Sequence, residues 1–587
     1  MKLLRPHFVL LFIVFITFAA FYPSLSNDFA GWDDRLHLDY HLIGSLHWDN
    51  IKSLFTHTTN KTYIPLTMLS FAVEHKFFKY NAFGYHVDNL ILHLFNVALM
   101  FYFCLKLNLK LRAAFLAALL FAIHPARVES VAWITERKDV LYLFFYLLSL
   151  HSYLQFIHTR RRIFYGLTLM MGILSMLAKP TAISLPLVLM LLDWFYERRG
   201  TLKLMSEKLP FFLLLWPLAL PTILLSPKTV SIHPDIFSAF LIFVWSFSFY
   251  VVKFFFPVIL LPMYQTPEPI GLQSLVYLFS LLIFVLFIYV GVKFRRNRWF
   301  MFCVMFYLCS LFYVFRFDKM TNLTVVGDRF LYLASIGPCL FLATWLDQIW
   351  SRSQKRFLWI PIILVLVFLI GKTYQQNKIW KDGFTMWNYV IQHDSHIAVA
   401  YNNRGVFYQL KEDYVKARSD YEKALNINPK YVDAYANLGY LDYVENKLDV
   451  ALKNLDQAFY LEPLSCDIRY KRGMVLEKLN QWNASIEDYN QAINACPNYA
   501  EVYFARANFY FARQSFNQAL ADYDQVIKLD PSHASAYNNR GNLYFLKGDK
   551  ERALSDYQKA VLIDPYHPDA HRNLETLSKA NRALSPN

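Results

Sequence analysis

The chain has 587 residues, of which 56% are hydrophobic, 18% aromatic and only 18% charged. This composition is too apolar for an ordinary soluble enzyme and indicates a protein that is largely embedded in a membrane. The formal net charge of +15 would suit a nucleic-acid-binding protein, but residues 396–587 hold 23 basic and 24 acidic side chains. The basic excess therefore lies in the first 395 residues, in short clusters between apolar runs, which is the pattern of cytoplasmic loops.

The apolar runs predict about 11 to 13 membrane helices, since a crossing takes about 20 helical residues. The runs are 7–22, 88–105, 113–123, 140–157, 163–178, 181–196, 209–226, 274–292, 300–315, 329–349 and 357–371. The basic clusters that mark the cytoplasm are Lys2 and Arg5; Lys106, Lys110 and Arg112; Arg160, Arg161 and Arg162; Arg198 and Arg199; Lys293, Arg295, Arg296 and Arg298; and Arg352, Lys355 and Arg356.

The run 236–262 is the ambiguous one. Basic clusters at 198–199 and 293–298 both indicate the cytoplasm, so an even number of crossings must separate them. The run is then either two short helices or one in-plane or re-entrant segment.

The same parity places four loops away from the cytoplasm, together with everything after residue 372. These loops are 23–87, 124–138, 257–273 and 316–328. The first contains "FAGWDDRLHLDY", so the adjacent carboxylates Asp33 and Asp34 are expected at the outer boundary of the membrane.

Residues 396–582 show an internal repeat. Prolines recur every 34 residues, and a glycine or alanine in each unit keeps the same interval: Pro429, Pro463, Pro497, Pro531 and Pro565; Gly405, Gly439, Gly473, Ala507 and Gly541. A 34-residue period with this pattern is typical of tetratricopeptide (TPR) repeats. We expect five helix pairs over 396–565 and a capping helix over 566–582.

Four of the repeats carry an arginine in the first helix and an aspartate 16 residues later: Arg404, Arg472, Arg506 and Arg540, with Asp420, Asp488, Asp522 and Asp556. The second repeat has Leu438 and Asn454 instead. Because the two residue types are present or absent together, we predict ion pairs between the helices of one repeat. The alternative is an arginine ladder for an acidic ligand.

Six cysteines are too few for a disulfide framework, and Cys104, Cys303, Cys309 and Cys339 fall in membrane runs. Cys466 and Cys496 lie at the start and end of one helix pair, where the ends meet. A disulfide there suits an oxidising compartment, although Cys496 lies past the expected helix end, where the distance could exceed the reach of a bond.

Three outer segments supply charged residues at the membrane boundary. They are "HPARVESVAWITERKDVL", "LAKPTAISLPL" and "VVGDRFLYLASIG", with His124, Glu129, Arg137, Lys138, Lys179 and Arg329. Such side chains can simply extend their charged ends to the water at the membrane surface, or determine the orientation of the helices in the membrane. However, basic residues on the outer side oppose the usual trend, and a cationic pocket facing a pair of acids fits a phosphate at the membrane surface.

Five blocks in order resemble the transmembrane-and-TPR-containing (TMTC) protein O-mannosyltransferases and their bacterial relatives. They are "FAGWDDRLHL", "YIPLTMLSFAVEHKFFKYNAFGYHVDNLILHLFN", "HPARVESVAWITERKDVLYL", "AKPTAISLPLVLMLLDW" and "DRFLYLASIG". The resemblance implies a glycosyltransferase of the GT-C class, with a polyprenyl-phosphate sugar as donor and the acidic motif in the first outer loop. Residues 230–275 give no match.

We therefore expect an all-α protein with a GT-C-type membrane domain over 1–375, a linker helix over 376–395 and a TPR α-solenoid over 396–582. It would transfer a mannose-like sugar to a hydroxyl, Ser or Thr of a protein, on the non-cytoplasmic side: the periplasm in a bacterium, the ER lumen in a eukaryote. A TPR scaffold without catalysis, a flippase of lipid-linked sugars, and transfer to a lipid or glycan are the alternatives.

The resemblance and the chemistry assign roles to the candidate residues. Asp33 or Asp34 is the general base that takes the acceptor proton, and the other orients it or binds a divalent metal, if one is used. Arg137, Lys138, Arg329 and Lys179 are candidates for binding the donor phosphate, and His124 and Glu129 support them. The N-cap of a helix over 35–44 is the purely structural role open to Asp34.

Overall fold

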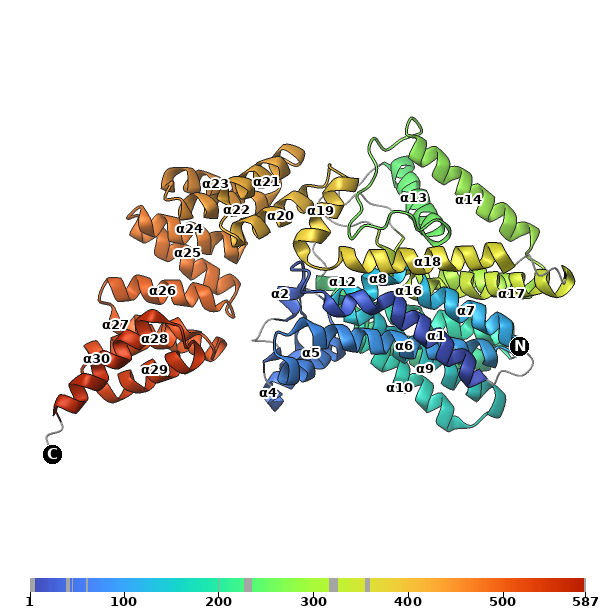
Figure 1. Cartoon of the computed structure of the whole chain (residues 1–587), viewed down its shortest axis with the longest axis horizontal. Helices are drawn as coiled ribbons and strands as arrows, with labels where there is room; N and C mark the ends of the chain where they lie inside the picture. Colours follow the sequence, from blue (N-terminus) through green and yellow to red (C-terminus); the bar gives the residue numbers. More distant parts are fainter. Residues whose placement is uncertain are drawn as a thin grey trace. The chain divides into compact units, whose positions relative to one another are not determined.

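The computed structural model of the chain is built from helices (Figure 1). It describes residues 6–38, 43–44, 46–59, 62–198, 200–225, 235–315, 326–353 and 359–584. The basic residues Lys2, Arg5, Arg199, Lys355 and Arg356 and the loop residues 316–325 lie outside these ranges. The chain divides into two compact units, Met1–Ser395 (unit 1) and His396–Asn587 (unit 2).

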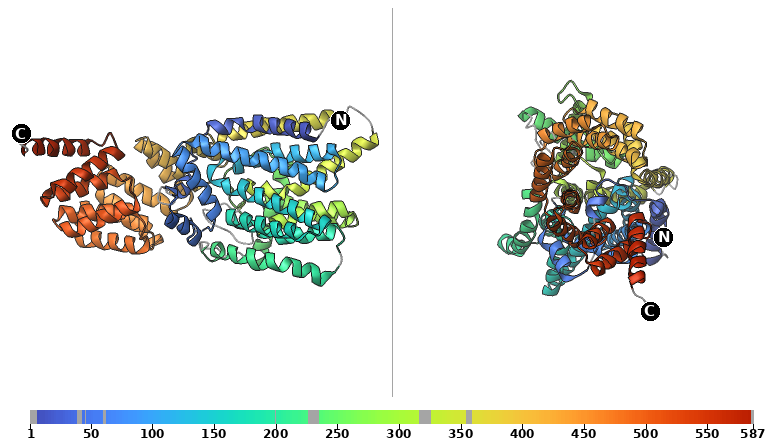
Figure 2. Two further views of the ribbon diagram at one scale, coloured as in Figure 1. Left: turned by 90° about the horizontal axis from the view of Figure 1, so that it is seen from below. Right: turned by 90° about the vertical axis from the view of Figure 1, so that its left-hand side faces the viewer.

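Unit 1 is an array of helices lying alongside one another, in which α1 and α18 are neighbours despite their distance in sequence (Figure 2). Its elements are α1 (Pro6–Phe21), η1 (Tyr22–Ser26), α2 (Asp34–His37), α4 (Trp48–Thr56), α5 (Pro65–Phe78), α6 (Ala82–Lys106), α7 (Leu111–Ile123), η2 (Pro125–Arg127), α8 (Val128–Ala132), η3 (Ile134–Glu136), α9 (Arg137–Thr159), α10 (Arg162–Ala178), η4 (Pro180–Ser184), α11 (Leu185–Phe195), α12 (Thr201–Leu225), α13 (Ile236–Phe255), α14 (Leu275–Lys293), α15 (Arg298–Leu311), η5 (Asp328–Phe330), α16 (Leu331–Ala334), α17 (Ile336–Ser353), α18 (Trp359–Ile379) and α19 (Gly383–His393).

Among the described residues, seven helices are long and apolar enough to cross a membrane, or nine if two bent pairs each count as one crossing. The bent pairs are Leu111–Ile123 with Pro125–Ala132, and Asp328–Ala334 with Ile336–Ser351. The remaining predicted runs also form helices, α10, α11 and α15, but these have only 17, 11 and 14 residues. A 14-residue helix covers about 21 Å, less than the hydrocarbon core of about 30 Å. The chain is a multi-pass membrane protein in which some helices stop short of a full crossing.

The ambiguous run 236–262 contains one helix, α13, which runs in the same direction as α14. Phe247 packs against Phe284 with ring centroids 5.2 Å apart. Closer to both C-termini, Phe255 and Val290 line one apolar cavity. Because the two helices begin at the same end, residues 256–274 must run back between them. This path is the one that the in-plane or re-entrant alternative predicts, although by length and composition α13 is also among the helices able to cross.

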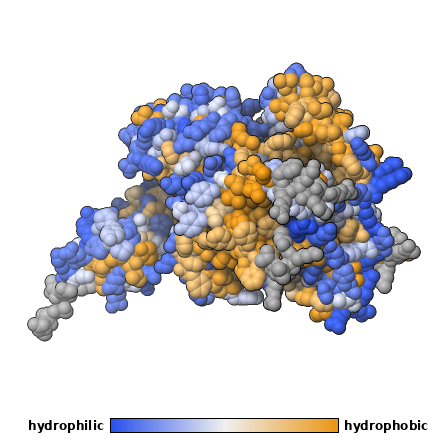
Figure 3. Space-filling view, turned by 45° about the vertical axis from the view of Figure 1, so that its right-hand side comes forward, coloured by the Kyte–Doolittle hydropathy of each residue, from blue (hydrophilic) through white to orange (hydrophobic). Residues whose placement is uncertain are grey.

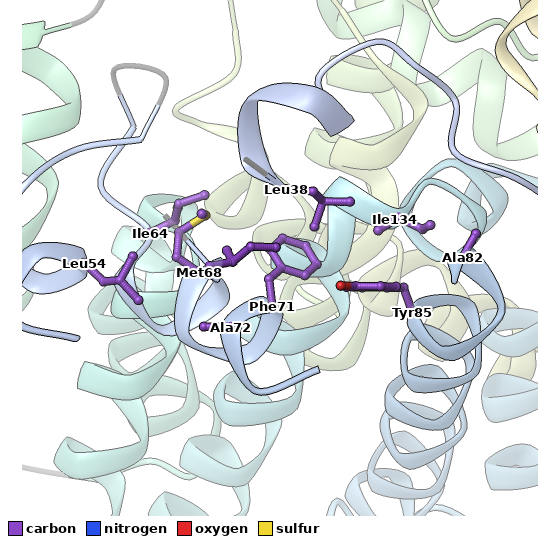
Figure 4. Packing of buried hydrophobic residues seen from close by; sticks show 10 residues of the cluster. Leu38, Leu54, Ile64, Met68, Phe71, Ala72, Ala82, Tyr85 and Ile134 are labelled. Atoms are coloured by element: carbon purple, nitrogen blue, oxygen red, sulfur yellow. The ribbon is translucent and has the colours of Figure 1, made fainter. Parts of the chain in front are cut away.

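Beneath α2, short elements from the first half of the chain share an apolar cluster (Figure 4). It comprises Leu38, Ile43, Leu54, Ile64, Met68, Phe71, Ala72, Ala82, Tyr85 and Ile134. This cluster joins the loop after α1 to α5, α6 and η3, so the end of α2 rests on a packed base.

The outside of unit 1 is hydrophobic over much of the face shown in Figure 3. α14 is the extreme case, because its large apolar side chains point outward, among them Leu275, Leu282 and Val285, each at least 60% exposed. Side chains of this kind at this exposure suit contact with lipid rather than with water.

Unit 2 consists of five helix pairs and a final helix, as the 34-residue period predicts. The pairs are α20 (Ala398–Leu410) with α21 (Tyr414–Ile427), α22 (Val432–Val444) with α23 (Leu448–Leu461), α24 (Cys466–Lys478) with α25 (Trp482–Ala495), α26 (Ala500–Ala512) with α27 (Phe516–Leu529), and α28 (Ala534–Leu546) with α29 (Lys550–Ile563), followed by α30 (Pro568–Leu584). The small residue of each first helix allows close packing: a Cβ on Gly405 would lie 2.6 Å from the ring of Tyr421.

The arginine and aspartate pairs of the repeats are confirmed as contacts between the two helices of one repeat. Each arginine binds its aspartate with two hydrogen bonds of 2.7–2.8 Å, in the four pairs Arg404–Asp420, Arg472–Asp488, Arg506–Asp522 and Arg540–Asp556. In the second repeat, Asn454 instead donates to Asp442 at 2.8 Å. The pairs therefore fix helix packing and are not a ladder for an acidic ligand.

Cys466 and Cys496 form a disulfide that joins the start of α24 to the residue after α25. Their Cα atoms are 6.1 Å apart, within the usual range for such a bond. The third repeat is thus held together covalently at the end where its helices meet.

Candidate active site

The loop that follows α1 is anchored just before the acidic motif. The backbone N–H of Asp28 donates to the carbonyl of Lys381 at 2.7 Å, which ties the loop to the segment after α18. Gly31 has φ of +67°, in the left-handed region that favours glycine. The chain turns at Gly31, and α2 begins at Asp34.

Asp34 is buried, with 2% of its surface exposed. Its Oδ2 accepts a hydrogen bond of 3.0 Å from the N–H of Gly31, whereas Oδ1 has no hydrogen-bond partner within the part of the chain that the structure describes. The indole N–H of Trp133 lies close enough to this carboxyl group to favour its ionised form, but the two do not meet in ordinary hydrogen-bond geometry. Burial raises the pKa of Asp34 to about 6, although the bond from Gly31 opposes the shift.

Asp33 lies in a different environment from Asp34. It is half-buried and is the residue that precedes α2, yet its carboxyl group makes no capping bond. Its carbonyl oxygen accepts from the ring Nδ1 of His37 at 3.0 Å. Asp34 is the first residue of the helix and bonds backward to Gly31, so the N-cap explanation for Asp34 is wrong. Of the helix expected over 35–44, residues 39–42 lie outside the described ranges.

Four tryptophans from distant segments surround the acidic motif. Trp32 stacks on Trp133 with ring centroids 4.9 Å apart and packs edge-on against Trp387 of α19 at 5.0 Å. Trp133 also stacks on Trp380 at 5.5 Å. The four rings thus form one aromatic cluster, and its member Trp133 lies against the carboxyl group of Asp34.

Trp133 connects Asp34 to a group of basic residues. The Nζ of Lys138 lies 6.0 Å from the centroid of the Trp133 ring, and the guanidinium carbon of Arg329 lies 5.8 Å from it. One tryptophan ring therefore separates the unpaired oxygen of Asp34 from two of the predicted phosphate-binding residues.

These basic residues converge on Glu136. Lys138 contacts Glu136 at 3.1 Å, and Lys179, from the turn after α10, contacts it at 3.2 Å. Lys179 also binds Asp139 at 2.5 Å. Burial and the positive charge of Lys138 lower the pKa of His37, which lies on the short helix that also carries Asp34.

Arg329 completes this network, which we call the Glu136 network. Its guanidinium pairs with Glu129 and lies 3.5 Å from Glu136. Its backbone N–H also donates to Glu129 at 2.9 Å. The network thus holds three cations, Lys138, Lys179 and Arg329, and three carboxylates, Glu129, Glu136 and Asp139. The sequence predicted a cationic pocket, but every cation of this group faces a carboxyl group.

Arg137 lies elsewhere, although it is the sequence neighbour of Lys138. It is 1% exposed, pairs with Glu74 and Asn89, and donates to the carbonyl of Tyr85 at 2.9 Å. Burial raises the pKa of Glu74 to about 8 against the opposing effect of Arg137. These contacts tie α5, α6 and α9 together beneath the site.

His124 makes two backbone contacts that define the break between α7 and η2. Its Nδ1 accepts from the N–H of Ala126 at 3.2 Å, and its Nε2 lies 2.8 Å from the carbonyl of Phe254 at the end of α13. The ring also stacks on Phe254. Its contacts position the backbone of α8, which carries Glu129.

Sequence reasoning missed a further group at the edge of the site. Lys253 of α13 has its Nζ 4.6 Å from the ring centroid of Tyr264, and the hydroxyl of Tyr264 donates to Asp328 at 2.8 Å. Within the described ranges Lys253 forms no salt bridge. Tyr264 thus links Lys253 to Asp328, the residue that precedes Arg329. A single lysine in an otherwise apolar helix is the signal that could have identified it.

The described residues contain no group of three His, Cys, Asp or Glu side chains placed to hold a metal ion. Asp33 and Asp34, the residues considered for such a role, face different partners.

The repeats of unit 2 match two family models. The model described as TPR repeat matches residues 476–512 and 507–548, and the tetratricopeptide repeat model matches 398–431 and 534–567. A TPR protein of known structure, YrrB, covers 32% of this chain at 26% identity, with a TM-score of 0.26.

Three curated relatives cover the chain more widely. They are the human protein O-mannosyl-transferase TMTC1, 27% identical over 68% of this chain; the Caenorhabditis elegans protein O-mannosyl-transferase F38B6.6, 27% over 65%; and the human protein O-mannosyl-transferase TMTC3, 24% over 65%. The chain resembles the TMTC O-mannosyltransferases. This confirms the resemblance drawn from the five sequence blocks. The matches take in 52%, 56% and 46% of these relatives, so the chain spans about half the length of the TMTC proteins that it matches.

Proposed function

We propose that this chain is a membrane glycosyltransferase that moves a mannose-like sugar from a polyprenyl phosphate to a Ser or Thr hydroxyl of a protein. The observation that carries the proposal is the buried carboxyl group of Asp34. One of its oxygens has no partner among the described residues, and one tryptophan ring separates it from Lys138 and Arg329. The names of the curated relatives agree with the reaction type.

Asp34 is the general base in this proposal. The acceptor oxygen forms a bond to the anomeric carbon of the sugar, and its proton passes to Oδ1 of Asp34. The bond from the anomeric carbon to the phosphate oxygen breaks, and its electron pair leaves with the lipid phosphate. A base with a pKa of about 6 is ionised at neutral pH and still basic enough to share a proton in the transition state.

The Glu136 network stabilises the leaving phosphate. Lys138, Lys179 and Arg329 are held by carboxylates before any donor arrives, so little reorganisation is needed when charge develops on the phosphate. Each cation can turn part of its hydrogen bonding from a carboxylate to phosphate oxygens. Lys253, with no salt bridge in the described ranges, adds a fourth cation to this side.

Arg137 and His124 act indirectly in this scheme. Arg137 is saturated by Glu74, Asn89 and a carbonyl, and His124 by backbone groups. We assign both as positioning residues of the helices that bear the network.

Unit 2 supplies the acceptor-binding surface, since a TPR array offers an extended face for a peptide segment. The disulfide between Cys466 and Cys496 supports a place for these repeats in an oxidising, non-cytoplasmic compartment. The basic loops of the first 395 residues support the opposite side as cytoplasmic.

The test is transfer by the purified full chain from polyprenyl-phosphate mannose to a Ser/Thr peptide. Asp34→Asn should lower the rate by about 10²–10⁴. The exposed Asp49→Asn, in the nearby α4, is the matched control and should keep full activity. If no sugar is transferred by the unaltered chain, or if Asp34→Asn is fully active, the chain is a membrane scaffold or uses another group.

A further inference from the structure

Unit 2 contains a large cleft between its third and fourth repeats. It has a volume of about 1,090 Å³ and lies between α24, α25 and α26. Rings from four helices line it, among them Tyr443, Tyr470, Trp482 and Phe504. This volume is at the upper end of the range for ligand sites, which is roughly 300–1,000 Å³.

The cleft opens where a regular pattern of the repeats is interrupted. Asn437, Asn539 and Asn573 share one repeat position, and their side chains bond to an asparagine of the preceding repeat at 2.9–3.0 Å. The third and fourth repeats have Lys471 and Ala505 at this position. The amide contacts between successive first helices are therefore missing in the centre of the array, and aromatic rings take their place.

The most accessible ring of the cleft is Trp482, which is 41% exposed. The guanidinium carbon of Arg513 lies 4.0 Å from the centroid of the Trp482 ring and 3.6 Å from that of Phe509. Arg513 also reaches Glu477 across the cleft at 3.5 Å. The indole is thus fixed in one orientation and leaves part of its surface open.

The rim of the cleft is polar. Asn480, Asn483 and Lys478 are exposed, and Glu477 accepts a hydrogen bond from the hydroxyl of Tyr489 at 3.1 Å. A flat ring beside amides and a carboxylate suits a ligand with one C–H face and a border of hydroxyls.

We propose that this cleft binds a hexose attached to a peptide, in other words a segment that has already been O-mannosylated. The sugar stacks its C–H face on Trp482 and places its hydroxyls against Asn483 and Glu477, while the peptide follows the neighbouring asparagines. This inference rests on the proposed function, because unit 1 would make such a segment. Its consequence is retention of the product, which favours further transfer to nearby Ser and Thr residues.

The experiment measures binding to the full-length protein in detergent by fluorescence anisotropy. The probes are a labelled Ser/Thr peptide with one O-linked mannose and the same peptide without it, and methyl mannoside serves as a competitor. The mannosylated peptide should bind about tenfold more tightly, the effect of one good aromatic stack. Methyl mannoside should compete only weakly, because it lacks the peptide.

Trp482→Ala should abolish this preference. Asn483→Ala should reduce it, and because Asn483 is exposed this second variant poses little risk to folding. Tyr566→Ala is the matched control, since Tyr566 is 92% exposed and outside the cleft. Equal affinity for the two peptides, or a preference that survives both cleft variants, would overturn the proposal.

Binding by an Asp34→Asn protein separates this inference from the proposed function. The variant should bind both peptides as the unaltered protein does. Loss of transfer with binding intact supports both ideas. Normal transfer by the variant rejects only the role of Asp34, and absent binding rejects only the cleft.

Discussion

Replacing Asp34 with asparagine should make the protein more stable while it removes the activity. In the folded protein the pKa of the carboxyl group is about 6, against 3.8 in the unfolded chain. A raised pKa means that the protonated form is favoured on folding. The contribution of the Asp34 carboxyl group to folding stability is fully present below pH 3.8 and is lost as the pH rises through 6. About 2 pKa units correspond to about 3 kcal/mol at neutral pH, which the uncharged amide of Asn recovers.

The assay is thermal unfolding of the two proteins in detergent at several pH values, together with sugar transfer. At pH 8 the variant should be the more stable by about 3 kcal/mol, and at pH 4 the two should unfold alike. Asp49→Asn should show no such difference, because Asp49 is exposed. Equal stability of the unaltered protein and the variant at pH 8 would show that the folded protein ionises Asp34 at no cost in free energy. The reasoning that the site keeps a buried base at the expense of stability would then be refuted.

Three other outcomes are expected. The transfer rate should rise with pH through about 6 and then level off, because Asp34 must lose its proton to act. The Asp33→Asn variant should keep this midpoint. A rate that does not change between pH 5 and 8 would contradict the assignment of Asp34 as the base. Lys253→Met should weaken donor affinity while leaving the KM for the acceptor peptide unchanged, and the reverse pattern would place Lys253 on the acceptor side. Cys466→Ser with Cys496→Ser should lower the stability of the repeats by about 3–4 kcal/mol for a 30-residue separation, and identical melting with and without reductant would argue against the bond.

Some of this structure follows from local rules and could be predicted. The repeats obey one rule: a small residue of the first helix, such as Gly405, lets a large side chain of the second approach, Tyr421 in the first repeat and Leu455 in the second. The period alone therefore locates every helix pair. The pairing of Arg404 with Asp420 was also predictable, because the two residues vary together from repeat to repeat.

The site is harder to predict, because its contacts join distant segments. Lys138 and Arg137 are adjacent in sequence, but successive residues of a helix point in different directions, so one joins the Glu136 network and the other binds Glu74. The acidic and basic residues of segment 124–139 can be identified from the sequence alone. Which base meets which acid depends on Lys179 and Arg329, which the fold brings from far along the chain.

The direction of α13 is another property that could not be predicted from the amino-acid composition. A run of apolar residues predicts a helix, but its sense is set by what its two ends contact. Phe254 is placed by His124, and the return to α14 follows from that contact. Lys253 contacts Tyr264, and Tyr264 contacts Asp328, only because of this return.

The cations of the Glu136 network are already paired with carboxyl groups, and this determines which anions the site binds weakly. Three cations with three carboxylates produce little field beyond their immediate surroundings, so dissolved anions are not drawn to them from a distance. Inorganic phosphate and nucleotides should therefore be poor inhibitors at millimolar concentration. A donor held in the bilayer by its lipid tail needs no such attraction, because it reaches the cations by diffusing within the membrane. The paired acids would thus keep the site open to a phosphate that arrives on a lipid and closed to one that arrives from water.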